Sequence, residues 1–513
     1  MSGTAWGGGY VTDVRYGHGY FPEQSPPLLR AACLLNGVAW DVPDEGGHYL
    51  ELGCGQGLGA VLVAAANPSW RVTAVDFAPA HIAGARALAR EAGIGNVEFI
   101  EADLAGFAGT PACAALPEAD IVTLHGVWSW VGPAVREGVV RLLASKLRAG
   151  GVAHVSYNAL PGWQRLLGLQ RVVRETGLRL ADRSDRQALA GFEVAQALLA
   201  AEAGTLRGDP ALARWLDIAA GLSPEYLAHE YMNAHWQPCW HAEVAGALAA
   251  AKLDWVGTAT LPEAFPGFTM TAAQREIYER FSDPLARELV KDVCLGRTLR
   301  HDVYVRGARR LGEQARDDAL RSLMLALCVP PARMRYEVEV GAGRAELSPD
   351  YYGPVVAALA EGPRSVADLL RLAPRRAGAR ENPAELVGVL AGTRQAMVLA
   401  RPGAAPHPAA LRLNRVVARR FGVREHLNRG AGLASTALGA AMPVTTACLF
   451  ACANEVEGGA PDLEDWTENL GAGLDAEDRA RLQEALRRAV DEDLPILRAL
   501  ACHSTWSRDP LEG

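Results

Sequence analysis

Three closely spaced glycines in the segment ELGCGQG, residues 51–57, form the strongest chemical signal in the sequence. Gly53, Gly55 and Gly57 follow an apolar run and precede a helical pattern, which predicts a tight turn from a strand into a helix. Such a turn lets the backbone approach a ligand, and the first N–H groups of the helix are free to bind it. The turn alone does not identify the ligand. Gly55, Gly57 and Ala60 also fit the GxGxxA pattern of a dinucleotide site, and a turn that only packs helix against strand is a third interpretation.

Acidic residues near the ends of three successive predicted strands narrow the choice of ligand. Asp76 follows the glycine turn by about twenty residues, where a carboxylate accepts hydrogen bonds from ribose hydroxyls. An NAD enzyme needs the same acid, so Asp76 does not separate the two ligands. Glu51 precedes Gly53, and Asp103 with Leu104 closes the third strand, where an acid and a backbone amide can bind an adenine edge. This set of acids favours S-adenosylmethionine over NAD.

The elements that must position these residues alternate between strand and helix. Five short strand-like runs lie between residues 48 and 158, separated by stretches of helical period: HYLELG, RVTAVDF, VEFIEAD, ADIVTLHGV and GVAHVSYN. Strands separated by helices predict a parallel α/β sheet, whose strands end at one shared edge. LDWVGTATL and HDVYVRG are expected to add two further strands, so that this domain ends near Arg310.

The order of these motifs resembles that of the class I S-adenosylmethionine-dependent methyltransferases. The resemblance implies a Rossmann-like sheet and a cofactor site formed by Glu51, Gly53, Gly55, Asp76, Phe77, Asp103, Leu104 and His125. The segments LHGVWSWV, SYNALPGW and YLAHEYMNAHWQP more narrowly resemble bacterial methyltransferases that carry a regulatory domain, a group that includes protein-lysine methyltransferases. The resemblance covers most of residues 16–306, the following module more loosely, and the last hundred residues only weakly.

Aromatic residues after the fourth and fifth strands are the candidates for binding a methyl acceptor. Trp128, Trp130 and Tyr157 stand at the carboxyl edge of the sheet, where α/β proteins bind ligands. Their faces can hold a sulfonium or ammonium by cation–π contact, although core packing is an equal alternative for Trp130. We therefore predict Tyr157, Asn158, Trp128 and His125 as the catalytic set. His125 can act as a general base or bind the methionine part of the cofactor, or it can be a structural histidine.

A second group of polar residues lies in the segment YLAHEYMNAHWQPCWH. His229, Glu230, His235, Cys239 and His241 resemble a metal-binding set at first sight. However, the two first histidines are six residues apart, not four as in HExxH, so we predict no metal. We interpret this segment as a helix near the acceptor pocket or a subunit contact.

The sequence divides into four predicted regions. Residues 1–45 are an N-terminal cap, and residues 46–310 are the methyltransferase domain with a helical insertion at 159–252. Residues 311–402 are a winged-helix-like regulatory domain with a terminal strand pair, and residues 403–513 are a helical C-terminal domain. The third helix of the winged-helix-like domain carries Glu381, Glu385 and one Arg394, the wrong charge for a DNA groove. We therefore expect this domain to pack against protein.

Composition limits the partners of the chain. It has 513 residues and a net charge of -8, so we expect no nucleic-acid binding, which needs a broad cationic surface. No uninterrupted apolar stretch is long enough for a membrane span, and the first residues have no apolar signal core. Nine cysteines without a CxxC pair fit a reducing compartment, so we expect a cytoplasmic protein that does not bind membranes.

These residues together predict an S-adenosylmethionine-dependent methyltransferase. Methyl transfer is an in-line displacement from a sulfonium, so the enzyme must align the acceptor and exclude water. The resemblance favours a protein amine, a lysine, as the acceptor. A small-molecule acceptor such as a natural product, and a non-catalytic regulator that only binds S-adenosylmethionine, are the alternatives. We also expect that the chain can form a homodimer.

Overall fold

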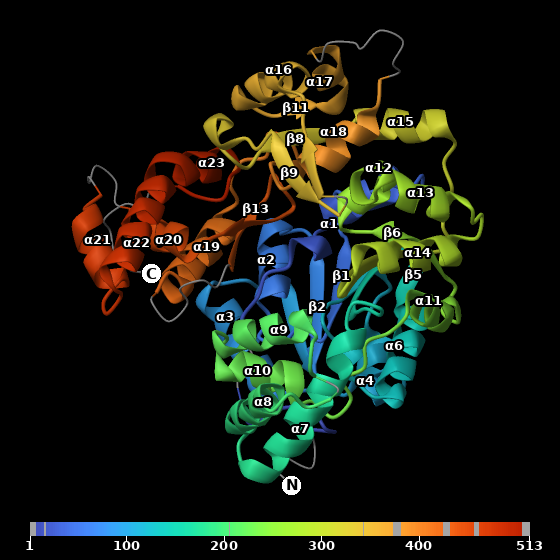
Figure 1. Ribbon diagram of the computed structural model, residues 1–513. Coiled ribbons are helices and arrows are strands. Elements are labelled where there is room, and N and C mark those ends of the chain that lie inside the picture. Colours follow the sequence, from blue (N-terminus) through green and yellow to red (C-terminus); the bar gives the residue numbers. More distant parts are fainter. Residues whose placement is uncertain are drawn as a thin grey trace.

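A seven-stranded mixed sheet lies at the centre of the molecule, with helices on both faces (Figure 1). The computed structural model describes residues 7–14, 17–204, 206–341, 343–372, 381–423, 431–455 and 461–504. The sheet has the order β3-β2-β1-β4-β5-β7-β6. Its strands are β1 (His48–Leu52), β2 (Arg71–Asp76), β3 (Val97–Glu101), β4 (Ala119–Leu124), β5 (Leu147–Asn158), β6 (Leu253–Thr258) and β7 (Leu299–Arg306).

The strand directions confirm the α/β sheet predicted from the sequence. The first five strands are parallel, whereas β7 runs antiparallel to both of its neighbours, β5 and β6. The two strands expected after the helical insertion therefore extend this same sheet. Because the chain reverses the strand order at β1 and β4, the carboxyl ends of these strands border a crevice where α/β proteins bind ligands.

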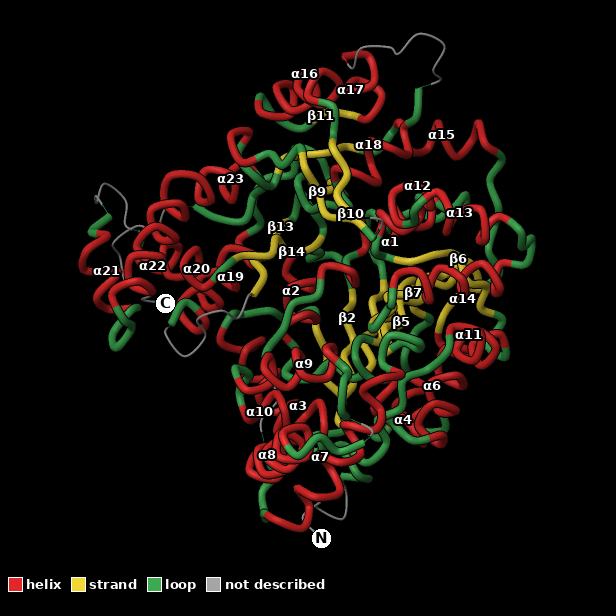
Figure 2. The backbone as a smooth tube through the Cα atoms, viewed as in Figure 1, coloured by secondary structure: helices red, strands yellow, loops and turns green. Residues whose placement is uncertain are grey.

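Helices cover each face of the sheet and bury both sides of its strands (Figure 2). One face packs against α1 (Pro26–Leu35), α2 (Leu58–Ala66) and α3 (Pro79–Glu91). The other packs against α4 (Leu104–Phe107), α5 (Pro111–Ala115), α6 (Pro133–Lys146) and α11 (His241–Ala249). Burial on both faces makes β1 and most of β2, β4 and β5 buried at consecutive positions instead of at alternate ones.

The helical insertion after β5 has a small core of its own. It consists of α7 (Leu167–Leu180), α8 (Ser184–Ala200), α9 (Pro210–Ala220) and α10 (Pro224–Tyr231). Val11 and Val14 from the N-terminal segment complete this core. After β6 the chain forms α12 (Pro266–Thr269), α13 (Ala272–Glu279) and α14 (Pro284–Leu295) before it enters β7. The N-terminal segment is thus tied to the insertion, whose first helix begins about 150 residues further along the chain.

The region after β7 combines helices with a three-stranded sheet of order β11-β8-β12. Its elements are α15 (Glu313–Arg321), β8 (Met324–Leu327), the hairpin β9 (Glu337–Val340) and β10 (Gly343–Glu346), α16 (Pro349–Ala360), β11 (Arg364–Ser365), α17 (Val366–Leu372), α18 (Pro383–Leu390) and β12 (Ala396–Leu399). The predicted terminal strand pair is wrong, because β12 pairs with β8, which precedes the helices. The winged-helix arrangement is therefore not confirmed.

The last described part of the chain is mainly helical, as the sequence predicts, but it also contains a hairpin. Its helices are α19 (Pro408–Phe421), α20 (Thr446–Asn454), α21 (Leu463–Leu470), α22 (Ala476–Arg488) and α23 (Leu494–Ala499). The hairpin β13 (Ala431–Ser435) and β14 (Ala440–Val444) was not expected, because its strands are rich in alanine, which has low strand propensity. Burial of the hairpin against the rest of the molecule overrides that propensity.

A buried network of ion pairs fastens β7 to its surroundings. The Arg300 side chain is only 1% exposed, and it donates to Asp302 at 2.9 Å, Asp292 at 2.6 Å and Glu288 at 2.8 Å. Lys291 and Arg297 add further cations, which pair with Glu288 and Asp292. Although burial alone would raise the pKa of Glu288, Lys291 and Arg300 hold it at about 2. The network joins β7 and α14 through charges that compensate one another.

Removal of the central cation of this network is expected to destabilise the fold strongly. Arg300→Ala leaves the buried Asp302 without its arginine partner and removes one of the cations that pair with Asp292 and with Glu288, which costs about 3–5 kcal/mol. Arg71→Ala is the matched control, since Arg71 and Glu98 form a half-exposed pair at 2.8 Å, worth at most about 1 kcal/mol. Urea unfolding of the full chain measures both variants. Equal effects of the two substitutions would contradict the role of the network.

Candidate functional site

A cavity of about 550 Å³ opens at the carboxyl edge of the parallel strands. Its volume lies in the usual range of small-molecule and cofactor sites. Its walls come from the glycine turn after β1, the ends of β2, β4 and β5, the N-terminal segment around Tyr10 and Phe21, and helix α10.

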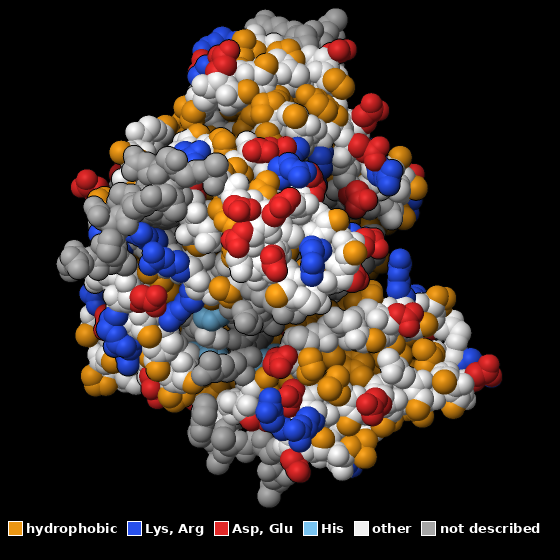
Figure 3. Space-filling model, turned by 90° about the vertical axis from the view of Figure 1, so that its left-hand side faces the viewer, with side chains coloured by type: hydrophobic (Ala, Val, Ile, Leu, Met, Phe, Trp, Pro, Cys, Tyr) orange, Lys and Arg blue, Asp and Glu red, His pale blue; other side chains and the backbone are white. Residues whose placement is uncertain are grey.

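Lysine, arginine, aspartate and glutamate side chains are mixed over the face of the molecule in Figure 3, where histidine side chains are visible in the lower half.

The glycine turn has the geometry expected from its sequence. Gly53, Gly55 and Gly57 all have positive φ, of 73°, 54° and 75°. A Cβ on Gly53 would lie 2.2 Å from Val127 and one on Gly57 2.5 Å from Ala85, so these two positions are closed by packing. A Cβ on Gly55 would meet nothing within 4 Å. The backbone at Gly55 is therefore open toward the cavity.

Asp76 holds this turn in place. Its Oδ2 accepts a hydrogen bond from the Gly55 N–H at 2.8 Å, and its Oδ1 accepts from the Ala78 N–H at 2.9 Å. His81 Nδ1 lies 3.2 Å from the same Oδ1. A carboxylate oxygen has two lone pairs, so the group can bind further hydroxyls from the cavity. Asp76 thus shapes the turn as well as offering acceptors to a ribose.

Glu51 is a buried acid with an unsatisfied oxygen. Its side chain lines the cavity and is 6% exposed, and its Oε2 has no hydrogen-bond partner among the described residues. Burial and the nearby Asp76 carboxylate raise its pKa to about 8. An amine or ammonium group in the cavity would satisfy this oxygen. The orphaned oxygen is what a site for the amino group of a methionine needs.

The adenine side of the predicted site is also assembled. Phe77, Asp103 and Leu104 line the same cavity as the glycine turn. Asp103 caps α4 with one oxygen, which accepts from the Ala105 N–H at 2.9 Å. The ring of Tyr10 lies edge-on to Phe77, with 5.6 Å between centroids. Tyr10 was not predicted, because a segment rich in glycine and aromatic residues gives no structural period to read.

Two members of the predicted catalytic set point away from the cavity in whole or in part. Trp128 is 3% exposed and packs in the core instead of lining the cavity. It begins the 3-10 turn η2 (Trp128–Trp130). Because a 3-10 helix turns by about 120° per residue, Trp130 points in a different direction from Trp128 and lines the cavity in its place. The Tyr157 ring touches the cavity, but its hydroxyl donates to Asp302 at 2.6 Å.

The wall next to Asn158 is rich in tryptophan. Trp130 and Trp163 line the cavity, and Trp236 lies between them, with ring centroids 6.2 Å and 5.2 Å away. The side-chain amide of Asn158 also lines the cavity, and no described residue is hydrogen-bonded to it. Trp163 and Trp236 were missed by the sequence analysis, because each stands in an irregular segment whose side-chain directions follow no period. Together they form an aromatic wall beside a free amide.

His125 lines the cavity as predicted, but as a neutral group. Phe21 stacks on its ring with 3.7 Å between centroids, and its Nδ1 lies 3.0 Å from the Ser156 hydroxyl. Burial and the neighbouring His301 hold the pKa of His125 well below its usual value. The rings of His154 and His301 continue this stack. At neutral pH His125 therefore offers hydrogen bonds and an apolar face, not a positive charge.

Helix α10 closes the cavity from the side opposite the sheet. Tyr226, His229 and Glu230 line it from this helix, and Asn233 and His235 from the residues just after it. This places the segment near the pocket, one of the two positions expected from the sequence. No group of three or more His, Cys, Asp or Glu among the described residues is arranged to hold a metal. Burial raises the pKa of Glu230 to about 7.

Comparison with known proteins places this architecture in a family. Residues 50–151 match the model of a methyltransferase domain, and residues 223–306 match that of a predicted methyltransferase regulatory domain. The protein sll1526 of Synechocystis sp. is 32% identical over 364 residues, which cover 71% of each chain. The chain belongs to the S-adenosylmethionine-dependent methyltransferases that carry this regulatory domain.

Solved structures agree with this assignment at the level of the fold. PKMT2 from Rickettsia typhi in complex with AdoHcy superimposes with a TM-score of 0.67 at 16% identity, over 95% of this methyltransferase and 99% of that chain.

A trans-aconitate 2-methyltransferase of Paracidovorax citrulli is similar in sequence, with 33% identity over 105 residues, which cover 20% of this chain and 36% of its own. The glycine turn, Asp76 and the orphaned Glu51 oxygen fit S-adenosylmethionine, the cofactor of the methyltransferase.

The regulatory-domain match falls on a different region from the one expected from the sequence. Residues 223–306 include α10, β6, α14 and β7 of this methyltransferase, whereas the sequence analysis assigned a regulatory domain to residues 311–402. The matched part supplies one wall of the cavity and two strands of the central sheet. Among the residues that the structure describes, no helix is both long and apolar enough to cross a membrane.

The buried Glu51 carboxyl is expected to make cofactor binding depend on pH. With a pKa of about 8 it is mostly protonated at pH 6 to 7.5, and a bound ammonium favours its ionised form. Binding therefore releases a proton, and the affinity advantage of the wild type over Glu51→Gln should grow with pH in this range, by at most about tenfold per unit. Calorimetry with S-adenosylhomocysteine measures it. A constant ratio would show that Glu51 does not meet the amine.

Proposed function

We propose that this methyltransferase transfers the methyl group of S-adenosylmethionine to a lysine amine of a protein. The observation that carries the proposal is the tryptophan wall beside Asn158, in a cavity that also contains the acid Glu230. The cofactor supplies a methyl group on a sulfonium, which an amine accepts by in-line displacement. The resemblance of three sequence segments to bacterial protein-lysine methyltransferases supports the same acceptor.

The aromatic wall suits the apolar stem and charged head of lysine. Trp130 and Trp163 line the cavity, and each cation–π contact of such a ring to an ammonium contributes about 0.5–2 kcal/mol. These rings also exclude water from the acceptor, which favours the neutral amine over the ammonium. Asn158 adds a side-chain carbonyl that can accept an N–H bond and orient the nitrogen lone pair.

A lysine must lose a proton before it can accept a methyl group. With an unperturbed pKa of about 10.4, its deprotonation at pH 7 costs roughly 4–5 kcal/mol. Glu230 lines the cavity, and its pKa of about 7 makes it partly ionised at neutral pH. The carboxylate attracts the ammonium and takes its proton, while the desolvating tryptophan wall lowers the pKa of the amine. Glu230 and the wall therefore act on the same step.

Transfer of a labelled methyl group tests the acceptor class. The enzyme is incubated with methyl-labelled S-adenosylmethionine and a total protein extract, and the proteins are then precipitated. We expect the label in the protein fraction, stable to mild base and recovered as methyllysine after acid hydrolysis. Label in base-labile protein esters or in extractable small molecules would contradict a lysine acceptor, although the methyltransferase assignment would remain.

Replacement of Glu230 tests the proton step. Glu230→Gln should lower the transfer rate at pH 7 by at least about tenfold and remove the rise in rate that the wild type shows through pH 7. The affinity for S-adenosylhomocysteine should change less than threefold. Glu225→Gln on the same helix is the matched control, since Glu225 does not line the cavity. An unchanged pH profile in Glu230→Gln would show that another group accepts the proton.

A further inference from the structure

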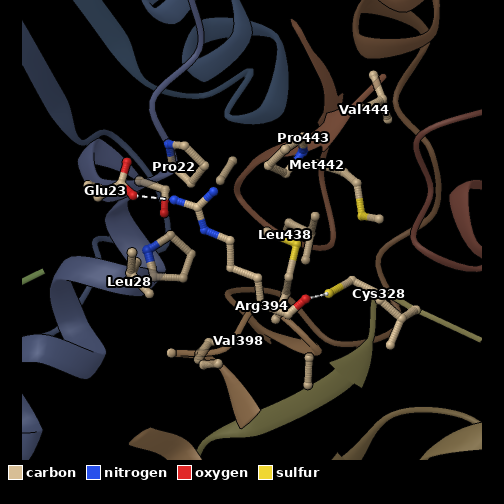
Figure 4. Close-up of a pocket in the computed structure, with 18 of the residues that line it drawn as sticks. Pro22, Glu23, Leu28, Cys328, Arg394, Val398, Leu438, Met442, Pro443 and Val444 are labelled. Atoms are coloured by element: carbon tan, nitrogen blue, oxygen red, sulfur yellow. Dashed lines mark hydrogen bonds and ion pairs between the residues drawn. The ribbon is translucent and has the colours of Figure 1, made fainter. Parts of the chain in front are cut away.

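A second cavity of about 360 Å³ lies where three parts of the chain meet. It is bordered by the 3-10 turn η1 (Pro22–Gln24) and the start of α1, by the end of α18 and β12, and by β14 with the start of α20. Most of its walls are apolar, as the close-up in Figure 4 shows for Leu28, Val398, Leu438 and Met442. Apart from Ala259, Thr260 and Leu261, its lining residues lie outside the matched methyltransferase and regulatory segments.

Two arginines, Arg333 and Arg394, line this cavity. Arg333 pairs with Glu492 at 2.9 Å and with Asp493, an acid that also lines the cavity, at 3.5 Å, whereas Arg394 has unused donors. Arg394 extends across it and forms an ion pair with Glu23 through Nη2 (Figure 4). Its Nε and Nη1 have no hydrogen bond to any described residue, and its side chain is 64% exposed. The guanidinium therefore lies at the mouth. Because each two-donor edge of a guanidinium includes Nη2, an anion that binds in a forked geometry must share Nη2 with Glu23 or displace it.

The backbone holds Arg394 in this position at a cost. Arg394 has a φ of 55°, a left-handed conformation that glycine or asparagine adopts more readily. Its carbonyl accepts a hydrogen bond from the Cys328 thiol at 3.2 Å. Strained positions of this kind are concentrated at binding sites. The backbone preference of arginine therefore does not explain its presence here.

We propose that this cavity binds an aliphatic monocarboxylate, with the carboxylate on Arg394 and the hydrocarbon chain among the apolar walls. A cavity of 150 Å³ accommodates benzene, so 360 Å³ has room for about 14 non-hydrogen atoms, which matches a chain of eight to twelve carbons. The bound carboxylate competes with Glu23 for the guanidinium.

The turn η1 separates this cavity from the cofactor cavity. Pro22, Glu23 and Ser25 line the smaller cavity, whereas Phe21 and Gln24 line the larger one. Phe21 stacks on His125, whose ring lies 5.5 Å from that of His301. Burial lowers the pKa of His301, and the negative charge of Glu23 opposes that shift. A ligand that releases Glu23 from Arg394 frees η1 and loosens this wall. Occupation of the small cavity should therefore weaken cofactor binding, and the reverse effect must be equal.

Calorimetry on the full chain with octanoate, decanoate and octan-1-ol tests the site. The wild type should bind octanoate at least tenfold more tightly than octan-1-ol, which lacks the charge. Arg394→Asn, which tolerates the left-handed backbone, should lose that preference, whereas Glu23→Gln should bind octanoate about threefold to tenfold more tightly. Opposite effects of the two substitutions distinguish competition from simple damage to the fold. Equal binding of the acid and the alcohol to the wild type, or weaker binding to Glu23→Gln, would overturn the site.

The coupling has its own measurement, which depends on the cofactor lying in the larger cavity. Saturating decanoate should weaken the binding of S-adenosylhomocysteine about fivefold in the wild type and leave it unchanged in Arg394→Asn. Decanoate binding that leaves the affinity for S-adenosylhomocysteine unaltered would overturn the coupling while the carboxylate site stands. Loss of S-adenosylhomocysteine binding in the absence of decanoate would instead point to a failure of the cofactor assignment.

Discussion

Helix α2 is apolar on every side, and the rest of the architecture follows from the need to cover it. Its sequence LGAVLVAAA contains no polar side chain, and all of its residues except Gly59 are buried. The central sheet covers one side, while β13, β14 and α19 cover the other. A helix with this pattern cannot lie on the surface of a sheet domain alone. The C-terminal region therefore completes the methyltransferase domain instead of standing apart from it.

The packing that holds α2 in place also positions the cofactor site, because the glycine turn leads directly into this helix. At the other end of α2, the Asn67 amide donates to the carbonyls of Val63 and Gly439, and Arg401 donates to the Asn67 side chain at 2.9 Å. Asp76 holds the turn itself through the Gly55 N–H. The helix is thus clamped at both ends, and the open backbone at Gly55 is preorganised for its ligand.

The segment that matches the regulatory domain also shapes the cofactor cavity. It contributes α10, with Tyr226 and Glu230 on one face, to the wall opposite the glycine turn. It also contributes β7, whose Asp302 receives the Tyr157 hydroxyl at the end of β5. Through the Arg300 network this segment fixes the acceptor side of the cavity. Because α10 lines the cavity and β7 holds Tyr157, a shift of either element would change the shape of the cavity.

Sequence analysis could predict the sheet and the cofactor side of the site, because both are encoded locally. The order of Glu51, the glycine turn, Asp76 and Asp103 reflects strand ends that must share one edge. The acceptor side could not be predicted to the same extent. The choice between Trp128 and Trp130 depends on the rotation of a three-residue turn, and Tyr10 and Trp163 reach the cavity from irregular segments. The alanine-rich hairpin β13–β14 packs against α2 and α19, tertiary contacts that its own sequence does not reveal.

We propose that one cavity aligns the cofactor with an amine acceptor at the tryptophan wall. A crystal structure of the full chain with S-adenosylhomocysteine tests it most directly. The account predicts the ribose hydroxyls on Asp76, the adenine beside Phe77 and Asp103, the amino group on Glu51, and the sulfur facing Asn158 and Trp130. A cofactor whose sulfur faces the Arg300 network, or an amino group that does not reach Glu51, would contradict it.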